Sequence, residues 1–282
     1  ASMNNQGVEF TVSFKSDPSS EFQWAVSANI GTYKTELTDL PSNVINKYAG
    51  DGVHDLILGR SPNSAYGLVA DGIFKTQEEV DAHADQPGKA VGRIRYKDLD
   101  GDGVINETYD RTWIGCYDPD FFGGLNFDFA YKGFDLNLFF EGMFGNDVNS
   151  DWKKESDIWL FTNPAWKNHA TRMLGGWSPD NPNSDIPAIS NNTANQEQRF
   201  SSWFIEDGSY IKLRNIELGY TFPTKLIKKM HMSNLRLYAA AYNVFTLKKF
   251  WGDDKYTSFD PERPSYHYLT PFTFNFGINV SF

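Results

Sequence analysis

The sequence predicts an all-β protein whose antiparallel sheet faces lipid on one side and water on the other. Three observations favour this fold: long runs of alternating apolar and polar residues, run lengths close to those of membrane-spanning strands, and connections that are alternately short and long. Successive side chains of a strand point to opposite faces, so alternation gives one apolar and one polar face. A membrane β-barrel needs this arrangement, because its outside meets lipid and its lumen is wet.

The clearest run covers residues 272–282, where every even-numbered residue is apolar and every odd-numbered residue is small or polar. Six further segments repeat the pattern: 8–14, 22–30, 125–131, 134–141, 203–222 and 235–242. In the segment 203–222 the alternation shifts by one residue at Arg214-Asn215, which predicts a β-bulge. Soluble strands average five or six residues and membrane strands about 9–11, and most of these runs approach or reach the larger figure.

The connections between these runs are sorted by length. A tight turn at Ser16–Ser20, a minimal hairpin at Lys132-Gly133 and a link of moderate length at 223–234 alternate with three long excursions, 35–120, 146–202 and 248–270. In an antiparallel sheet this order places every short turn at one end and every long loop at the other. Outer-membrane barrels have short periplasmic turns and long extracellular loops.

A soluble β-sandwich is the alternative fold, because it also buries one alternating face. It would make the chain a secreted or surface module that binds glycans or calcium. A sandwich has no reason to sort its loops by side, however, so we favour the barrel. Seven strands cannot close, and an open edge in lipid leaves backbone groups unpaired. We therefore expect this chain to be the C-terminal part of a larger barrel, which meets other strands along 8–14 and 272–282.

Composition excludes several other classes of protein. The 282 residues carry a net charge of -10, which argues against a nucleic-acid partner. No run of 18 uncharged apolar residues occurs, so the sequence predicts no transmembrane helix. Residues 1–7 lack the features of a signal peptide, and Cys116, the single cysteine, cannot form an internal disulfide. We find no catalytic triad or phosphate-binding glycine loop, so we expect no enzyme and no required cofactor.

Several motifs together resemble a known family. They are Asn5-Gln6-Gly7-Val8-Glu9, the stretch from Tyr96 to Asn106, Trp177-Ser178-Pro179-Asp180-Asn181-Pro182, the run from Glu206 to Ile216, Leu218-Gly219-Tyr220, Tyr242-Asn243-Val244-Phe245-Thr246 and the terminal Phe282. Nearly end to end, the chain resembles the C-terminal third of the SusC/RagA-type TonB-dependent outer-membrane transporters of Bacteroidetes.

The resemblance implies a 22-stranded transmembrane β-barrel in the outer membrane, of which this chain supplies the last seven or so strands. It also implies a plug domain, outside this chain, through which a TonB complex supplies energy. A SusD-like surface lipoprotein would close over the barrel. The expected function is the import of oligosaccharides or peptides. The end of the chain is similar to the signal that the barrel-assembly machinery reads, with Asn275, Gly277, Val280 and Phe282 at its positions.

The loop 98–110 is a candidate calcium site. Asp98, Asp100 and Asp102 stand at positions one, three and five of a calcium loop, and Gly103 stands at the sharp-turn position six. Val104 offers its carbonyl at position seven, and Asn106 and Asp110 complete the candidate ligand set. Carboxylates this close repel each other unless a cation neutralises them. Tyr109 replaces the usual glutamate at position twelve, so a solvated Asp/Gly-rich turn is the alternative, and any Ca²⁺ would be structural.

Aromatic residues of the long loops are the remaining candidates for contact with cargo. They are Trp152, Trp159, Phe161 and Trp166 in one loop and Tyr48, Tyr66, Tyr256 and Tyr266 in others. Such rings stack on sugars or anchor peptides. They also serve to pack a loop onto its lipoprotein partner, which we favour. The sequence does not identify a substrate-binding residue.

Overall fold

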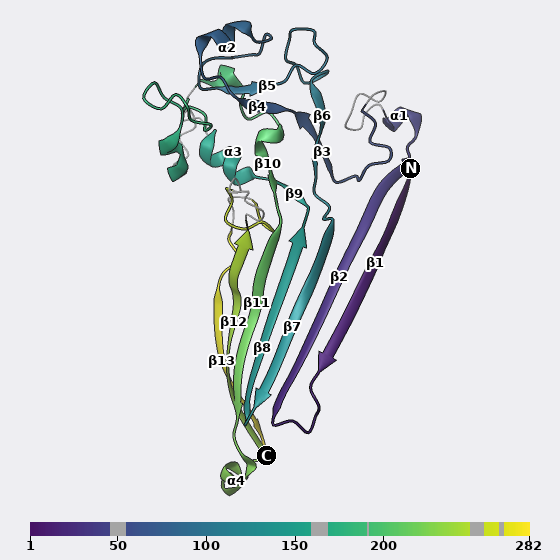
Figure 1. Cartoon of the computed structure of the whole chain (residues 1–282), viewed down its shortest axis with the longest axis vertical. Helices are drawn as coiled ribbons and strands as arrows, with labels where there is room; N and C mark the ends of the chain where they lie inside the picture. The colour runs from purple at the N-terminus through teal and green to yellow at the C-terminus, as the bar shows by residue number, and fades with distance from the viewer. Residues whose placement is uncertain (46–54, 159–168, 191, 249–256, 265–267) are drawn as a thin grey trace.

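The computed structural model describes residues 1–45, 55–158, 169–190, 192–248, 257–264 and 268–282. Its main body is one antiparallel sheet in which the strands are neighbours in chain order. The strands are β1 (Ser2–Lys15), β2 (Phe22–Asp39), β7 (Phe121–Tyr131), β8 (Phe134–Phe144), β11 (Tyr210–Thr221), β12 (Asn234–Lys248) and β13 (Thr273–Ser281). Figure 1 shows them as long, slanted strands, with β1 and β13 at the two edges. The predicted all-β, seven-stranded antiparallel sheet is confirmed.

The register of the sheet places all the apolar alternations on one face. One cross-strand row runs through Trp24, Phe129, Leu136, Leu218, Ala239 and Phe276. This face is uncovered: Leu218 is 51% exposed and Phe276 is 82% exposed. In the described part of the chain, the other sheets have two strands each, and none forms a second layer over it. The β-sandwich alternative is therefore wrong, because a sandwich would bury this face in a protein core.

The connections are sorted by side as the sequence predicts (Figure 1). Lys132 and Gly133 both have positive φ, 48° and 88°, which gives a two-residue hairpin between β7 and β8. The link between β11 and β12 holds α4 (Thr224–Ile227) and a 3₁₀ turn at Lys228–Met230. All three short connections lie at one end of the sheet, and the long excursions lie at the other.

The predicted bulge in β11 is confirmed. Leu213 pairs with Phe140 and Asn215 pairs with the adjacent Phe139, so Arg214 is an extra residue on β11. A one-residue insertion changes which face the following side chains occupy. Ile211 and Leu213, which are odd-numbered and precede the bulge, therefore share the apolar face with the even-numbered residues that follow it.

The long excursions contain folded structure that alternation alone does not predict. Their strands are β3 (Ser64–Leu68), β4 (Ala70–Ile73), β5 (Ile94–Tyr96), β6 (Arg111–Cys116), β9 (Asp147–Asn149) and β10 (Ile205–Asp207). Their helices are α1 (Ser42–Ile45), α2 (Gln77–Ala82) and α3 (Asp151–Asp157), with 3₁₀ turns at Thr171–Gly175, Thr193–Asn195 and Ser202–Phe204. Thr76 caps α2 by accepting a hydrogen bond from the Glu79 amide at 3.3 Å.

A small hydrophobic core joins two of the long loops. Leu68, Ile94 and Tyr96 from the first loop pack with Phe204 from the second, and all four are at most 1% exposed. The buried guanidinium of Arg93 lies 2.6 Å from the carboxylate of Glu197, and this ion pair joins the same two loops. The loops are thus held together at the end of the sheet by apolar burial and by this buried ion pair, with Lys75 and Asp185 as a second, more exposed pair. Within the described ranges, no helix has the length and apolarity needed to cross a membrane.

Candidate functional site

The polar face of the sheet carries interlinked charged and amide side chains. Arg236 on β12 donates to Asp135 from Nε at 3.0 Å and to Glu217 at 2.7 Å. Asn137 on β8 donates from Nδ2 to Asp128 at 2.7 Å and also contacts side-chain amides on β7 and β11. These hydrogen bonds cross four adjacent strands, so the polar groups of this face are paired with one another. We call this face of the sheet the polar wall.

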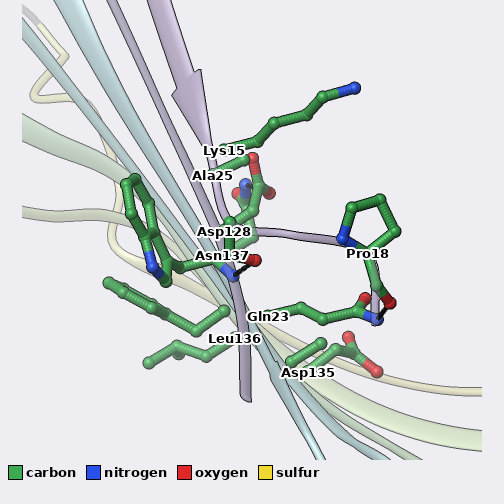
Figure 2. A pocket seen from close by; sticks show the side chains of 12 residues that line it. Lys15, Pro18, Gln23, Ala25, Asp128, Asp135, Leu136 and Asn137 are labelled. Carbon is green, nitrogen blue, oxygen red and sulfur yellow. Dashed lines mark hydrogen bonds between the residues drawn. The ribbon is translucent and has the colours of Figure 1, made fainter. Parts of the chain in front are cut away.

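A hollow of about 360 Å³ lies at the short-turn end of this face (Figure 2). Lys15 from β1 and Asp128 from β7 line it, together with Gln23 and Asn137. The Gln23 amide donates to the carbonyl of Pro18 in the turn at 2.9 Å. Because the hollow presents an ammonium and carboxylates together, its lining has no single charge preference.

At the loop end, a cluster of charges ties the segment 257–264 to the wall. We name Lys212, Arg214, Asp260 and Glu262 the latch cluster. Lys212, whose side chain is 3% exposed, lies 2.6 Å from Asp260 and also bonds Glu262. Arg214 bonds Glu262 and the wall residue Glu141, the latter at 2.8 Å. Burial alone would raise the pKa of Glu262, but hydrogen bonds from Arg214 and Lys212 outweigh it and lower that pKa to about 2.

Sequence reasoning missed the latch cluster. Lys212 and Arg214 belong to a motif that carries the resemblance, but their acidic partners lie 48 and 50 residues further along the chain. The available signal was chemical, since a lysine on an inward position of a strand needs a counter-charge when buried. Nothing in the sequence identified which carboxylates supply it.

The structure brings the three aspartates of the predicted metal loop together. Carboxylate oxygens of Asp98, Asp100 and Asp102 all lie within 4.8 Å of one another. Asp98 accepts hydrogen bonds from the amides of Gly101 and Gly103, at 2.7 and 2.9 Å. The Gly103 amide is the main cause of a lowered pKa at Asp98. Gly101 and Gly103 have φ of 76° and 84°, so the turn uses glycine where the backbone is left-handed.

The other three predicted ligands have local partners. Asp110 is fully buried, and its two oxygens accept the amides of Leu99 and Asn106 at 2.8 and 2.7 Å, which closes the loop. The Asn106 side-chain oxygen accepts the Thr108 amide at 2.9 Å, and its Nδ2 contacts the carbonyl of Val104 at 3.4 Å. The donor set is hard oxygen throughout, which fits Ca²⁺, with the aspartate triad as its most open part.

The predicted assembly-signal residues divide between the two faces of β13. Asn275 and Gly277 pair with Ala240 and Tyr238 on the polar face. Val280 and Phe282 are 41% and 89% exposed. A Cβ built on Gly277 would overlap the ring of Tyr238, so the glycine also makes room for a cross-strand aromatic.

Of the loop aromatics, Trp152 and Tyr66 lie within the described residues. Trp152 packs edge-on against Phe259, with ring centroids 4.7 Å apart. Tyr66 packs on Trp113 at 4.9 Å. Both rings are thus engaged in packing within the loops. The other predicted aromatics lie outside the described residues: Tyr48, Trp159, Phe161, Trp166, Tyr256 and Tyr266.

Comparison with known proteins identifies relatives along the whole chain, although no family model matches it. The chain is 30% identical over 298 residues to TonB-dependent receptor P3 of Formosa agariphila, a match that covers 99% of this chain and 29% of the receptor. It is 26% identical over 294 residues to TonB-dependent receptor SusC of Bacteroides thetaiotaomicron, covering 100% of this chain and 26% of SusC.

A solved structure shares the fold. A chain of the RagAB peptide transporter superposes with a TM-score of 0.73 at 23% identity, covering 99% of this chain and 29% of that chain. The chain thus spans less than a third of the length of the proteins it matches. Their names agree with the motifs, the one-sided apolar sheet and the sorted loops described above. Over its whole length the chain is thus similar to one portion of TonB-dependent receptors, SusC among them, and it shares the fold of one portion of the RagAB structure.

Proposed function

We propose that this chain forms the C-terminal part of the barrel wall of a TonB-dependent transporter in the outer membrane. The observation that carries this proposal is the continuous, uncovered apolar face that runs across strands of 9 to 18 residues. Such a face is stable against hydrocarbon and unstable against water. The long loops at one end correspond to the extracellular side, and the short turns correspond to the periplasmic side.

The edges of the sheet define the first partners. Among the described strands, β1 and β13 each have one neighbour. In lipid, each unpaired backbone group costs several kcal/mol. We propose that the remaining strands of the same transporter, in a barrel of 22, pair with these edges. The plug domain of that transporter would occupy the lumen and engage the TonB complex.

The names of the relatives support a proposal for the cargo. RagAB is described as a peptide transporter, and SusC as a TonB-dependent receptor. We propose import of an oligosaccharide or a peptide together with a SusD-like lipoprotein seated on the long loops. The polar wall supports such a cargo, because it offers many hydrogen-bonding groups. A nucleic-acid cargo is disfavoured by the net charge of -10.

Deletion of the gene for the full receptor, followed by complementation, tests this function. We expect the deletion to abolish uptake of one labelled oligosaccharide or peptide class, and the full receptor to restore it only while TonB is active. Affinity purification of the receptor is expected to recover a lipoprotein. Normal uptake without the receptor, or uptake that continues after TonB is depleted, would contradict the proposal.

We further propose that the loop 98–110 holds a structural Ca²⁺. The close approach of three aspartates supports this, since a divalent cation relieves their repulsion. Calorimetry of the full receptor is expected to show calcium binding that the double variant D98N/D100N lacks. D180N, which removes an exposed charge from another loop, is the matched control. Absence of heat at millimolar calcium would refute the site.

A further inference from the structure

A second cavity, of about 620 Å³, lies at the loop end of the polar face. Met143 and Tyr210, paired across β8 and β11, form its wall on inward positions. Asp147 and Asp151 from the following loop line it, and Tyr117 lies at the same cavity. Anything that passes between the long loops and the lumen wall comes close to these groups. The cavity is therefore placed to contact cargo.

The lining carries negative charge that the described residues do not neutralise. Neither Asp147 nor Asp151 forms an ion pair with a lysine, arginine or histidine of the described part of the chain. Lys153, on the same helix as Asp151, bonds the Trp203 carbonyl at 2.5 Å and lies 3.7 Å from Glu206. The third carboxylate of the cavity, Glu262, is already paired within the latch cluster.

Asp147 also faces another carboxylate. It is the direct cross-strand partner of Asp207 in the β9–β10 pair, a juxtaposition of like charges that costs stability. Burial raises the pKa of Asp147, and Asp207 and Asp120 raise it further. Asp147 is thus a partly buried acid beside two other acids, and no basic residue of the described part of the chain pairs with it.

An orphaned acceptor lies in the same cavity. Asn146 is 6% exposed, and its side-chain oxygen has no hydrogen-bond partner among the residues that the structure describes. Buried polar atoms are normally paired, so this atom indicates a missing donor. The Tyr117 ring is 38% exposed and adds an aromatic face beside the carboxylates. Burial raises the pKa of the Tyr117 hydroxyl, and the charges of Asp147 and Asp151 raise it further.

We propose that this cavity binds an ammonium or guanidinium group of a cationic peptide cargo, held between Asp147 and Asp151 and against Tyr117. Such a group donates several hydrogen bonds, carries the complementary charge and stacks on an aromatic ring. The carboxylates of this cavity do not form a cluster of three close ligand atoms. Among the described residues, only the aspartate triad of the calcium loop does so. The cavity is therefore suited to an organic cation rather than to a metal ion. The inference rests on the proposed transport function, because it assumes that cargo passes this wall.

Binding of tetralysine to the purified full receptor tests the cavity. The comparison ligand is tetralysine with every side-chain amine acetylated, which keeps the length and removes those charges. We expect the receptor to prefer tetralysine about tenfold or more, and the double variant D147N/D151N to lose that preference. Asn at position 147 keeps an oxygen for the Cys116 amide, which Asp147 accepts at 2.8 Å, so the loop keeps its local bond.

Two further variants separate this site from general charge and from misfolding. D180N removes one exposed carboxylate from another loop and is expected to bind like the unaltered receptor. D151N alone removes no side-chain hydrogen bond or ion pair within the described part of the chain and is expected to weaken tetralysine binding several-fold. Equal affinity for the two peptides, or an unchanged preference in D147N/D151N, would overturn the proposal. If the receptor imports no cargo but still prefers tetralysine, the proposed transport function is wrong and the proposed binding site in the cavity stands.

Discussion

At the scale of single residues, two glycines on the polar face make room for side chains of the neighbouring strand, because they lack a Cβ. Gly277 lies under the ring of Tyr238, and Gly219 lies under the guanidinium of Arg236. In both cases a side chain from the neighbouring strand occupies the space of a missing Cβ. The sequence predicts that Gly277 belongs to an assembly signal, and the structure adds a packing requirement at the same position.

We expect Gly277→Ala to lower the thermal stability of the full receptor, because the new methyl group displaces the Tyr238 ring from the strand surface. The expected loss is about 1–3 kcal/mol, typical of an overpacked position. The double variant G277A/Y238A removes the overlap and is expected to recover part of that loss. A melting temperature for Gly277→Ala equal to that of the unaltered receptor would contradict this account.

The residues of the latch cluster illustrate why partners far apart in sequence were not predictable. Alternation assigns Lys212 to the inward face, but it holds no information on which loop returns to that point. Only the fold brings Asp260 and Glu262 to it. The close spacing of Asp98, Asp100 and Asp102 was predictable, in contrast, because a loop of five residues fixes it.

Acid is expected to loosen the segment 257–264. The pKa of Glu262 is lowered to about 2 from an ordinary value of 4.5. Its contribution to stability is therefore fully present above about pH 4.5 and is lost as the pH falls from there towards 2. We expect proteolysis of this segment in the folded receptor to accelerate over that range. A cleavage rate that does not change between pH 5 and pH 3, after correction for protease activity, would argue against the latch.

At the scale of elements, alternation predicted the centres of the seven strands well and their ends poorly. β7 begins at Phe121, four residues before the predicted run, because Phe122 and the pair Gly123-Gly124 interrupt the pattern. A Cβ on Gly123 would strike the backbone carbonyl of Asn29, so the glycine is required by close strand contact. Apart from β10, which lies inside the predicted run 203–222, the short strands of the loops escaped prediction, because runs of three to six residues carry too little periodicity.

The last strand offers a direct test at this scale. Deletion of Phe282 is expected to reduce the amount of full receptor in the outer membrane, because the proposed assembly signal would lose its aromatic residue. Immunoblots of membrane fractions measure the yield. Substitution of Phe282 with Tyr, which keeps the ring, is the matched control. Unchanged insertion after deletion would show that Phe282 is only one of many lipid-facing residues.

At the scale of the whole molecule, the arrangement of loops followed from counting residues between strands. An antiparallel meander returns to the same end after every second strand, so alternating connection lengths must separate by side. The sequence contains no comparable rule for which residues meet at the loop end of the sheet. The acidic cavity there is assembled from four separate stretches of chain, with the lining residues Tyr117, Asp147, Tyr210 and Glu262 one from each.

We expect the isolated chain to require detergent or lipid for solubility, because its apolar face is open to solvent along the full sheet. Expression of residues 1–282 followed by size-exclusion chromatography, with and without detergent, measures this. A sharp monomer peak in buffer alone would contradict the assignment of that face to lipid. Recovery of a discrete species only in the presence of detergent is the expected result.

The extra residue in β11 decides which environment the start of that strand meets. Without Arg214, the four positions that precede it would rotate by half a turn relative to the rest of the strand. The ammonium of Lys212 would then point into the bilayer, while Ile211 and Leu213 would turn to the aqueous interior. A single-codon deletion at this point would thus turn one cation of the latch cluster to the apolar face and remove the other.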